Sequence, residues 1–297
     1  MTYWLTLPSV CVAPRADPPS SPKVDAHYRL IRRVFGYPSE ISNDHLVLPR
    51  AIHEDAEALA AQALKPLLSP LRSDELPDML IDCRSVTSHS SLVPTYELAE
   101  RIGLLNALPW ALGGQAGAEV PHALVLLCNM LDNPPSSAAL VATQRVSMLD
   151  ARAWDGFYPL GDASAGILIS QFPIPKGFRL LGSAVGQGVK GWSSALKPTI
   201  SNVLSKIAVR ETTIQWVIAH QLSPDYVQAV HSAVPQARLL VRHYEQGVDF
   251  GCADPLISLS WIVDHRPEAV GGIGLICFAG RFGAVGAIVI QKERERV

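Results

Sequence analysis

The sequence predicts an α/β fold in which helices cover both faces of the sheets. Segments with strand character alternate with helical segments along most of the chain. The predicted strands are continuous apolar runs, as expected for strands that are buried on both faces. The two halves of the chain also repeat one order, because each has a glycine-containing turn that leads into an apolar helix.

The first half begins without clear periodicity. The first fifty residues are rich in proline and are expected to be irregular, with a surface loop at 14–22. Good helix formers with acidic residues in the first turn then predict a helix over 51–68. A short apolar run predicts a buried strand within 76–86, and a second helix is expected at 95–105.

The middle of the chain carries the most apolar of the predicted helices. That helix spans 113–131 and opens with two glycines, and it is expected to continue through Pro121. Two strands follow at 136–147 and 163–172, and the second of these consists of small and β-branched residues.

The second half is expected to repeat this order. Helices are predicted at 194–207 and from residue 225 onward, on either side of a strand at 214–220. The segment 241–265 is expected to form a strand, a glycine turn and a helix, and 273–291 two apolar strands joined by a turn. No linker separates residues 1–172 from 173–297, so both halves are expected to form one compact unit.

Composition excludes several classes of protein. The 297 residues carry 25 basic and 27 acidic side chains, a net charge of −2, without the basic excess typical of nucleic-acid binders. No stretch approaches the roughly 18 apolar residues that span a membrane. The first residues lack the basic start of a signal peptide. A soluble cytoplasmic protein is therefore expected.

The five cysteines show no paired CxxC spacing, which argues for reduced thiols and against a disulfide framework or a zinc site. Cys83, Cys128 and Cys277 lie inside apolar segments, where a free cysteine usually behaves as a small hydrophobic residue. These three thiols are expected to be buried.

Five segments resemble one known family, in its order along the chain. GGQAGAEVPHAL (113–124) is similar to a nucleophile elbow, in which cysteine followed by Ala-Gly begins a buried helix. The others resemble a Gly-Asp-Gly-Ala strand start (159–170), a His-Gln motif at a strand end (216–227), a Gly-Asn-Thr turn (251–265) and a closing glycine turn (278–290). The family is the ketoacyl synthase III branch of the thiolase-like condensing enzymes.

This resemblance implies a five-layered αβαβα sandwich built from two duplicated halves, usually dimeric. It also implies that the ligand is an acyl thioester, carried by coenzyme A or by the phosphopantetheine arm of an acyl carrier protein, with no bound metal or other cofactor. The implied partners are an acyl carrier protein and a second subunit, either another copy of this chain or a ketosynthase homologue.

Two of the family's three catalytic positions are changed. Gln115 stands where the acyl-accepting cysteine is expected, and an amide cannot form a thioester. Cys252 stands at the position of the family asparagine. Only His220 matches, at the position of the histidine that helps stabilise the enolate oxygen when malonyl groups lose carbon dioxide.

Other positions of the resembling segments are expected to line the substrate site: Gly114, Glu119, Gly280 and Gly283. Glu119 lies four residues after Gln115, on the same face if both are helical, and is either a base or a residue at a subunit boundary.

Alternative roles remain open for two of these residues. Cys252 precedes a helix, whose N–H groups would lower the thiol pKa and create a relocated nucleophile. Against this, cysteine in a tight glycine turn is a common neutral replacement for asparagine, and no general base is adjacent in sequence. His220 could likewise be a structural residue that caps the next segment or satisfies a buried carbonyl group.

The preferred function is a degenerate partner subunit of an active condensing enzyme in fatty-acid or polyketide-type metabolism. One alternative is a decarboxylase of malonyl-carrier protein in which Gln115 and His220 polarise the thioester. Others are an acyltransferase that uses Cys252, and a protein that holds an acyl thioester without reacting.

Overall fold

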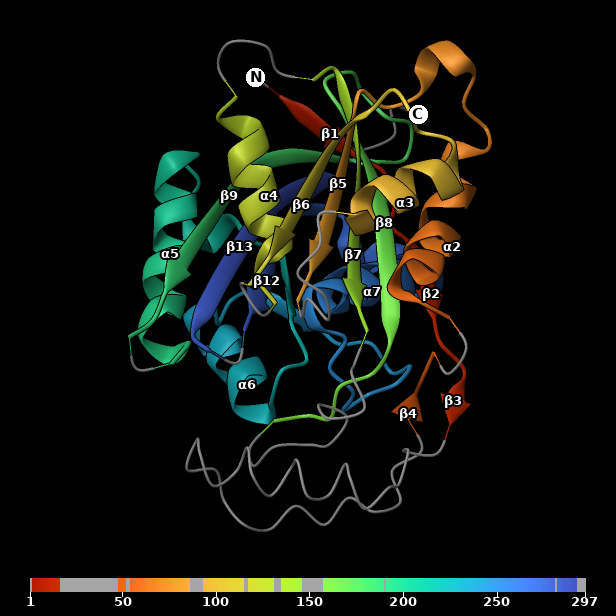
Figure 1. Cartoon of the computed structure of the whole chain (residues 1–297). Helices are drawn as coiled ribbons and strands as arrows, with labels where there is room; N and C mark the ends of the chain where they lie inside the picture. Colours follow the sequence, from red (N-terminus) through yellow and green to blue (C-terminus); the bar gives the residue numbers. More distant parts are fainter. Residues whose placement is uncertain are drawn as a thin grey trace.

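The computed structural model describes residues 2–16, 48–51, 54–85, 93–114, 117–130, 135–145, 157–189, 191–280 and 282–292. In this part of the chain, eleven strands are hydrogen-bonded into one mixed sheet system with helices on both sides (Figure 1). The strand order is β11-β10-β12-β13-β9-β1-β8-β7-β5-β6, and β2 lies beside β8.

From residue 54 to residue 172, the described part of the first half contains three parallel strands, one antiparallel strand and three helices. The strands are β5 (Met79–Arg84), β6 (Leu108–Gly113), β7 (Ser137–Gln144) and β8 (Ala163–Ser170). The helices are α2 (Ala56–Leu68), α3 (Val93–Ile102) and α4 (Glu119–Cys128).

The described part of the second half has a similar pattern, with three parallel strands, two further strands and three helices. Its strands are β9 (Phe178–Gln187), β10 (Trp216–Ala219), β11 (Arg238–Leu240), β12 (Gly272–Ala279) and β13 (Ala284–Lys292). Its helices are α5 (Ser193–Lys206), α6 (Pro224–Ala233) and α7 (Asp254–His265). Short 3-10 helices occupy Ser73–Glu75, Glu211–Thr213, Gly251–Ala253 and Pro267–Val270.

Burial divides these elements into five layers. Val120 and Leu124 of α4 share one hydrophobic core with Leu256 and Ile262 of α7, between strands of both halves. A second core lies under α2 and α3, and a third under α5 and α6, so these four helices form the outer layers (Figure 1). The expected αβαβα sandwich is confirmed.

The prediction that the first fifty residues are irregular is wrong for part of that segment. Strand β1 (Tyr3–Leu5) is buried and pairs with β8 on one side and β9 on the other, and so joins the two halves. Strand β2 (Ser9–Val12) pairs with β8, and β3 (Arg15–Ala16) pairs with β4 (Leu48–Pro49). The remainder of the predicted loop, 17–22, lies outside the described residues.

Other predicted boundaries need correction. The helix predicted from residue 113 begins at Glu119, because 108–113 is the edge strand β6. The strand expected from residue 241 lies earlier, at Arg238–Leu240. Beyond it, Arg242 is buried and pairs with Asp254. Helix α2 starts at Ala56, where the Asp55 carboxylate accepts a hydrogen bond from the Ala58 amide.

Strand β9 was not predicted at all. Among the described residues, none of the helices is long and apolar enough to cross a membrane.

Candidate functional site

The candidate site lies between the two halves of the chain, where the ends of β10 and β12 meet the segment that leads into α4. His220 directly follows β10 and is fully buried. Its Nδ1 accepts a hydrogen bond of 3.2 Å from the backbone amide of Ala279, the last residue of β12. This bond fixes the imidazole ring at the junction of the two strand ends.

Gly117 brings the segment before α4 against this histidine. A Cβ atom on Gly117 would lie 2.1 Å from the carbonyl oxygen of Ala279 and 3.2 Å from Cε1 of His220. The residue also has a φ of +133°, which side chains rarely adopt. Only glycine therefore allows this close approach.

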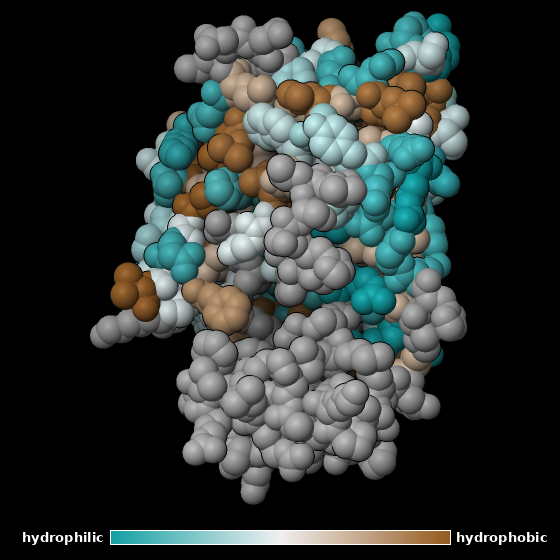
Figure 2. Space-filling model, in the orientation of Figure 1, coloured by the Kyte–Doolittle hydropathy of each residue, from teal (hydrophilic) through white to brown (hydrophobic). Residues whose placement is uncertain are grey.

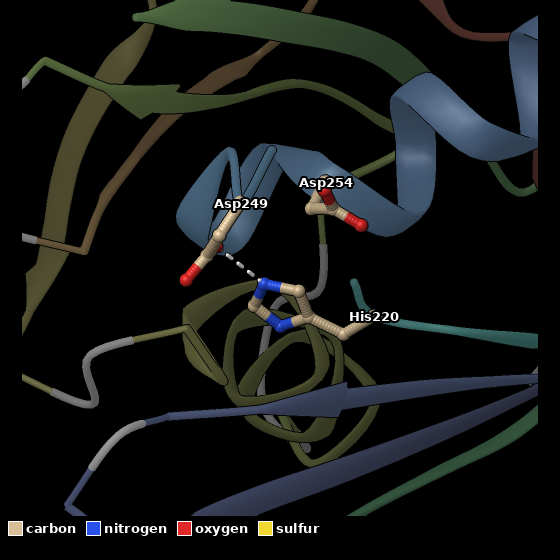
Figure 3. A group of neighbouring side chains, drawn as sticks. All are labelled: His220, Asp249 and Asp254. Atoms are coloured by element: carbon tan, nitrogen blue, oxygen red, sulfur yellow. Dashed lines mark hydrogen bonds and ion pairs between the residues drawn. The ribbon is translucent and has the colours of Figure 1, made fainter. Parts of the chain in front are cut away.

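Asp249 occupies the other nitrogen of His220 (Figure 3). Nε2 lies 2.8 Å from Oδ1 of Asp249. In the neutral ring, where Nδ1 accepts the Ala279 amide, the single ring proton is on Nε2 and is donated to the carboxylate. Burial lowers the pKa of His220, but the Asp249 carboxylate outweighs this effect, so the pKa is raised. Sequence reasoning missed Asp249, which lies 29 residues from the histidine in an irregular segment.

A second buried pair lies beside the first. Arg242 and Asp254 are both fully buried, and Nη1 of the guanidinium lies 2.8 Å from Oδ2 of the carboxylate. Asp254 also accepts the backbone amide of Gln221 at 2.8 Å. Arg242 donates further to the hydroxyl of Ser258 and to the carbonyl of Val248, and therefore has enough partners to offset its loss of water.

His220, Asp249 and Asp254 have ligand atoms within 4.8 Å of one another, a grouping that could in principle hold a metal ion. All three side chains already accept hydrogen bonds or an ion pair from internal groups. The Ala279 amide is bonded to His220 and Gly251 N to Asp249, while Arg242 neutralises Asp254. The group is therefore a satisfied hydrogen-bonded network that does not fit a cation.

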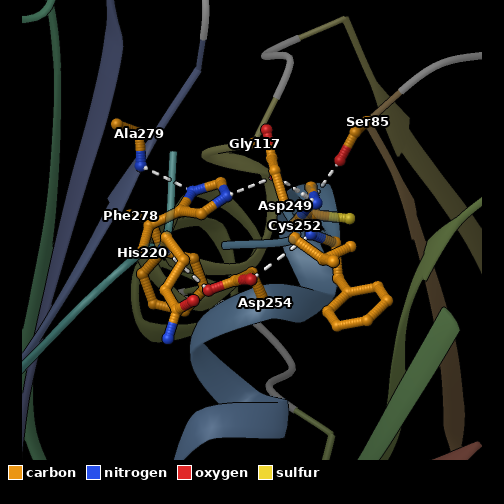
Figure 4. Close-up of polar contacts among 12 residues, drawn as sticks. Ser85, Gly117, His220, Asp249, Cys252, Asp254, Phe278 and Ala279 are labelled. Atoms are coloured by element: carbon orange, nitrogen blue, oxygen red, sulfur yellow. Dashed lines mark hydrogen bonds and ion pairs between the residues drawn. The ribbon is translucent and has the colours of Figure 1, made fainter. Parts of the chain in front are cut away.

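Cys252 lies in the 3-10 helix Gly251–Ala253 directly before α7, against the ends of the first-half strands (Figure 4). Its amide donates to Oγ of Ser85, which follows β5, and its thiol contacts the carbonyl oxygen of Cys83 at 3.4 Å. Burial, followed by the charge of Glu119, raises the pKa of Cys252 well above that of a free thiol. The expectation that the helix start lowers this pKa is wrong, because desolvation dominates.

Gln144, at the end of β7, is the most unusual polar residue here. It is 1% exposed, and within the described part of the chain neither its amide nitrogen nor its amide oxygen has a hydrogen-bond partner. The oxygen crowds Gly251, since a Cβ there would lie 2.2 Å from it. Sequence reasoning missed this residue, because a glutamine after an apolar strand resembles an ordinary exposed strand end.

Glu119 is buried within the chain and is the first residue of α4. Its carboxylate accepts a 2.8 Å hydrogen bond from the Gly117 amide. Helix α4 begins at Glu119, so the predicted helix face shared with Gln115 involves a residue that precedes this helix. Gln115 itself lies outside the described residues.

The remaining predicted residues lie in turns or in the core. Gly114 follows β6 with a φ of +83°, and Gly280 and Gly283 form the β12–β13 turn, where the Gly280 amide donates to Ala284. Cys83 and Cys277 are buried, as expected. The prediction for Cys128 is wrong, because its side chain is exposed near the end of α4.

The two halves use their strand ends in the same way. His220 follows β10 and meets the segment before α4, whereas Ser85 follows β5 and meets the segment before α7. The interior therefore contains two related junctions, each between a strand end of one half and a central helix start of the other.

Neither a protein-family model nor a curated protein sequence matches the chain. Solved structures do match over nearly its whole length. The chain is similar to 3-oxoacyl-(acyl carrier protein) synthase III, FabH, from Pseudomonas aeruginosa, with a TM-score of 0.73, 14% identity and 99% coverage of both chains. The fold is that of the thiolase-like condensing enzymes.

Two further structures extend this similarity within the ketoacyl synthase III-like group. OleA from Xanthomonas campestris, solved with bound lauric acid and lauroyl-CoA, has a TM-score of 0.72 and 11% identity, with coverage of 98% of this chain and 99% of OleA. ChlB3, described as an acyltransferase, has a TM-score of 0.71 and 14% identity, with 98% coverage of both chains. At these identities the similarity concerns the fold.

Proposed function

We propose that this chain is a ketoacyl synthase III-like protein that has lost acyl-transfer chemistry and acts as the partner subunit of an active condensing enzyme. The metabolism it would serve is of the fatty-acid or polyketide type. The observation that carries this proposal is the state of His220. Both of its ring nitrogens are bonded to internal groups, the Ala279 amide and the Asp249 carboxylate. Neither nitrogen remains to polarise a substrate carbonyl group.

The nucleophile positions support the same conclusion. Gln115 is an amide by sequence and cannot accept an acyl group. Cys252 is fully buried with a raised pKa, so its thiol is not the thiolate that acyl transfer requires. We therefore set aside acyl transfer through Cys252.

A free sheet edge supports a subunit contact. Among the described residues, strand β6 pairs with β5 alone, so its outer side presents backbone groups without a partner strand in that part of the chain. Leu108 of β6 is 53% exposed and Leu105, just before the strand, is 74% exposed. Hydrophobic side chains gather around α4 and β6 on this face of the molecule (Figure 2). We assign this edge to the contact with the partner, either a ketosynthase homologue or a second copy.

We place the approach of an acyl carrier protein at a different surface. Phe282 in the β12–β13 turn and Val189 after β9 are both exposed. Their turns are joined by hydrogen bonds from Gln187 Nε2 to the carbonyl of Phe282 and from Gly188 N to that of Gly283. This turn directly follows Ala279, so a carrier held here would be next to the His220 site.

Mixing experiments test the proposal. A ketoacyl synthase III homologue that retains its cysteine is assayed for carbon–carbon bond formation on malonyl-carrier protein, alone and with an equimolar amount of this chain. The proposal predicts a complex on size-exclusion chromatography and a gain in condensing rate of at least about tenfold, or 1.4 kcal/mol of transition-state stabilisation. No complex and no gain with any cysteine-bearing homologue encoded beside this chain would contradict it.

A further inference from the structure

An ion pair connects the start of the chain to the loop that carries Asp249. Arg15 lies in β3, which pairs with β4 in a two-stranded ribbon (Figure 1). Its Nε and Nη2 donate to Oε1 and Oε2 of Glu245 at 2.8 and 2.7 Å, across 230 residues of sequence. One guanidinium therefore holds both oxygens of the carboxylate, a geometry that adds orientation as well as energy.

The two partners of this pair differ in exposure. The side chain of Arg15 is 58% exposed, whereas that of Glu245 is only 6% exposed. Ion pairs between two exposed side chains contribute little, but a buried carboxylate that loses its guanidinium is left without compensation for its lost water. The position of the Glu245 side chain therefore depends on Arg15.

The backbone at Glu245 also needs a restraint. Its φ is +47°, in the left-handed region that residues other than glycine rarely adopt. The turn 244–247 contains a second left-handed residue, Gly247, with a φ of +81°. A non-glycine residue persists in this region where the surrounding structure holds it. At Glu245 the surrounding structure includes both hydrogen bonds from Arg15.

The turn 244–247 leads directly to Asp249. Buried Arg242 bridges the ends of the turn, because its Nε donates to the carbonyl of Tyr244 at 3.1 Å and its Nη2 to that of Val248 at 2.6 Å. Asp249 is the next residue, and its Oδ1 lies 2.8 Å from Nε2 of His220. A shift of the turn is therefore passed on to the carboxylate that contacts the ring.

The β3–β4 ribbon also reaches Asp249 from its other side. The amide of Asp249 donates to the carbonyl of Pro159 at 2.8 Å, and the amide of Gly161 donates to the carbonyl of Asp249 at 2.9 Å. The following residue, Asp162, donates its amide to the carbonyl of Pro49 in β4 at 3.0 Å. The ribbon therefore holds both flanks of Asp249, through β4 on one side and β3 on the other.

We propose that Arg15 and Glu245 are positioning residues for the His220–Asp249 pair. Their ion pair fixes the turn 244–247, and the fixed turn keeps the Asp249 carboxylate on Nε2 of His220. Without the ion pair, Glu245 loses the partner that holds its left-handed backbone, and Asp249 shifts away from the ring. The consequence for activity rests on the proposed function, in which Asp249 withholds this histidine from substrates.

The NMR signals of the labelled imidazole ring test this proposal. The pKa of His220 is shifted by burial and by the charges of Asp249, Asp254 and Arg242. The charge of Glu245 is not one of these causes. A lower pKa of His220 after a change at Glu245 therefore reports a displaced Asp249 carboxylate and not the loss of a nearby charge.

Two variants break the ion pair from opposite sides. Glu245→Gln keeps the shape of the side chain and removes its charge, whereas Arg15→Met removes the donors. Each is expected to lower the pKa of His220, by less than Asp249→Asn does. Each should also speed hydrogen exchange of the Gly251 amide, which donates to Asp249 Oδ1 at 2.7 Å, by at least about tenfold. Because both changes act on one pair, the double variant should show no more than the larger single effect.

Glu75→Gln is the matched control. Glu75 accepts hydrogen bonds of 3.0 Å from Nη2 and from the backbone amide of Arg72, in a 3-10 helix that precedes β5. This variant makes the same chemical change in another ion pair, and it should leave the pKa of His220 and the exchange of the Gly251 amide at their wild-type values. Slow exchange of the amides in the β12–β13 hairpin shows that each variant is folded.

A pKa of His220 that stays at the wild-type value in either single variant would overturn the proposal, as would unchanged exchange of the Gly251 amide. Additive effects in the double variant, or an equal effect of Glu75→Gln, would also overturn it. All of these measurements use the chain alone. Their failure is therefore distinct from a failure of the proposed function, which shows as the absence of a complex in the mixing experiment.

Discussion

Gly117 and Ala279 are in backbone contact across the interface of the two halves, so close that a methyl group on Gly117 would lie 2.1 Å from the Ala279 carbonyl oxygen. Gly117 precedes α4 in the first half, and Ala279 ends β12 in the second. The amide of the same Ala279 is bonded to His220. The position of the candidate site therefore depends on a contact that only glycine permits.

Gly117→Ala is expected to lower the free energy of unfolding by about 2–4 kcal/mol, because the new methyl group collides with backbone that cannot rotate away. Gly114→Ala is the matched control. Gly114 also has a positive φ, of +83°, but a Cβ there would meet no atom within 4 Å. It should cost only the backbone strain, about 1–2 kcal/mol. Urea unfolding of both variants measures the difference, and equal losses would contradict the contact.

The buried pair of His220 and Asp249 predicts a pH dependence. Because the folded-state pKa of His220 is raised, the stabilisation that it provides is fully present below about pH 6.5, the value for an unfolded histidine, and is lost as the pH rises through the raised pKa. Asp249→Asn is expected to cost about 1–3 kcal/mol at pH 6 and less at pH 9.

Asp249→Asn should also lower the pKa of His220, as measured by NMR of the labelled imidazole ring. Asp225→Asn, at an exposed position in α6, serves as the control. A pKa of His220 that is the same in wild type and Asp249→Asn would show that the carboxylate does not control this ring.

Thiol labelling tests the burial of Cys252. Cys128 is exposed and Cys11 is partly buried, whereas Cys83, Cys252 and Cys277 are buried. In the native protein, 5,5′-dithiobis(2-nitrobenzoate) is expected to react more quickly with Cys128 than with Cys11, because Cys128 is the more exposed of the two. Burial raises the pKa of both thiols, so both should react more slowly than a free cysteine. All five thiols should react in guanidinium chloride, and Cys128→Ser should remove the fast phase. Rapid native labelling of Cys252, located by peptide mass analysis, would restore it as a candidate nucleophile.

The sequence predicted the parts of the fold whose signal is local. The apolar runs that became β5 and the β12–β13 hairpin, and the run of helix formers in α2, were confirmed because burial on both faces requires such runs. Strands β1 and β9 were missed for a physical reason. Strand β1 has three residues, and β9 contains glycine, serine and alanine, so their pairing depends on neighbours distant in sequence.

The site shows the same division. His220 was found from its motif at a strand end, but Asp249 and Gln144 have no local signature. Asp249 meets His220 only because the segment after β11 leaves the sheet, and that departure follows from the pairing of Arg242 with Asp254. The pKa of Cys252 was predicted in the wrong direction, because the sequence shows a helix start but not the degree of burial around it.

The exposed edge of strand β6 predicts that this chain associates with another subunit through that edge. Leu108→Lys places a charge on the exposed side of this strand, where lysine discourages edge-to-edge pairing. Sedimentation is expected to show loss of the complex with the partner subunit, or of the dimer if the chain pairs with itself, without a change in thermal stability. Phe172→Lys, at a 69% exposed position in the β8–β9 turn, is the control. Association that survives Leu108→Lys but not Phe172→Lys would place the interface elsewhere.

The central claim is that this chain performs no acyl-thioester chemistry of its own, and incubation with malonyl-carrier protein tests it most directly. Mass spectrometry of the carrier follows both decarboxylation to acetyl-carrier protein and acyl transfer to the chain. The account predicts acetyl-carrier protein at the rate of the protein-free control and no acylated chain. Turnover that is present in the wild type and disappears in both His220→Ala and Gln115→Ala would contradict it and identify the chain as a decarboxylase.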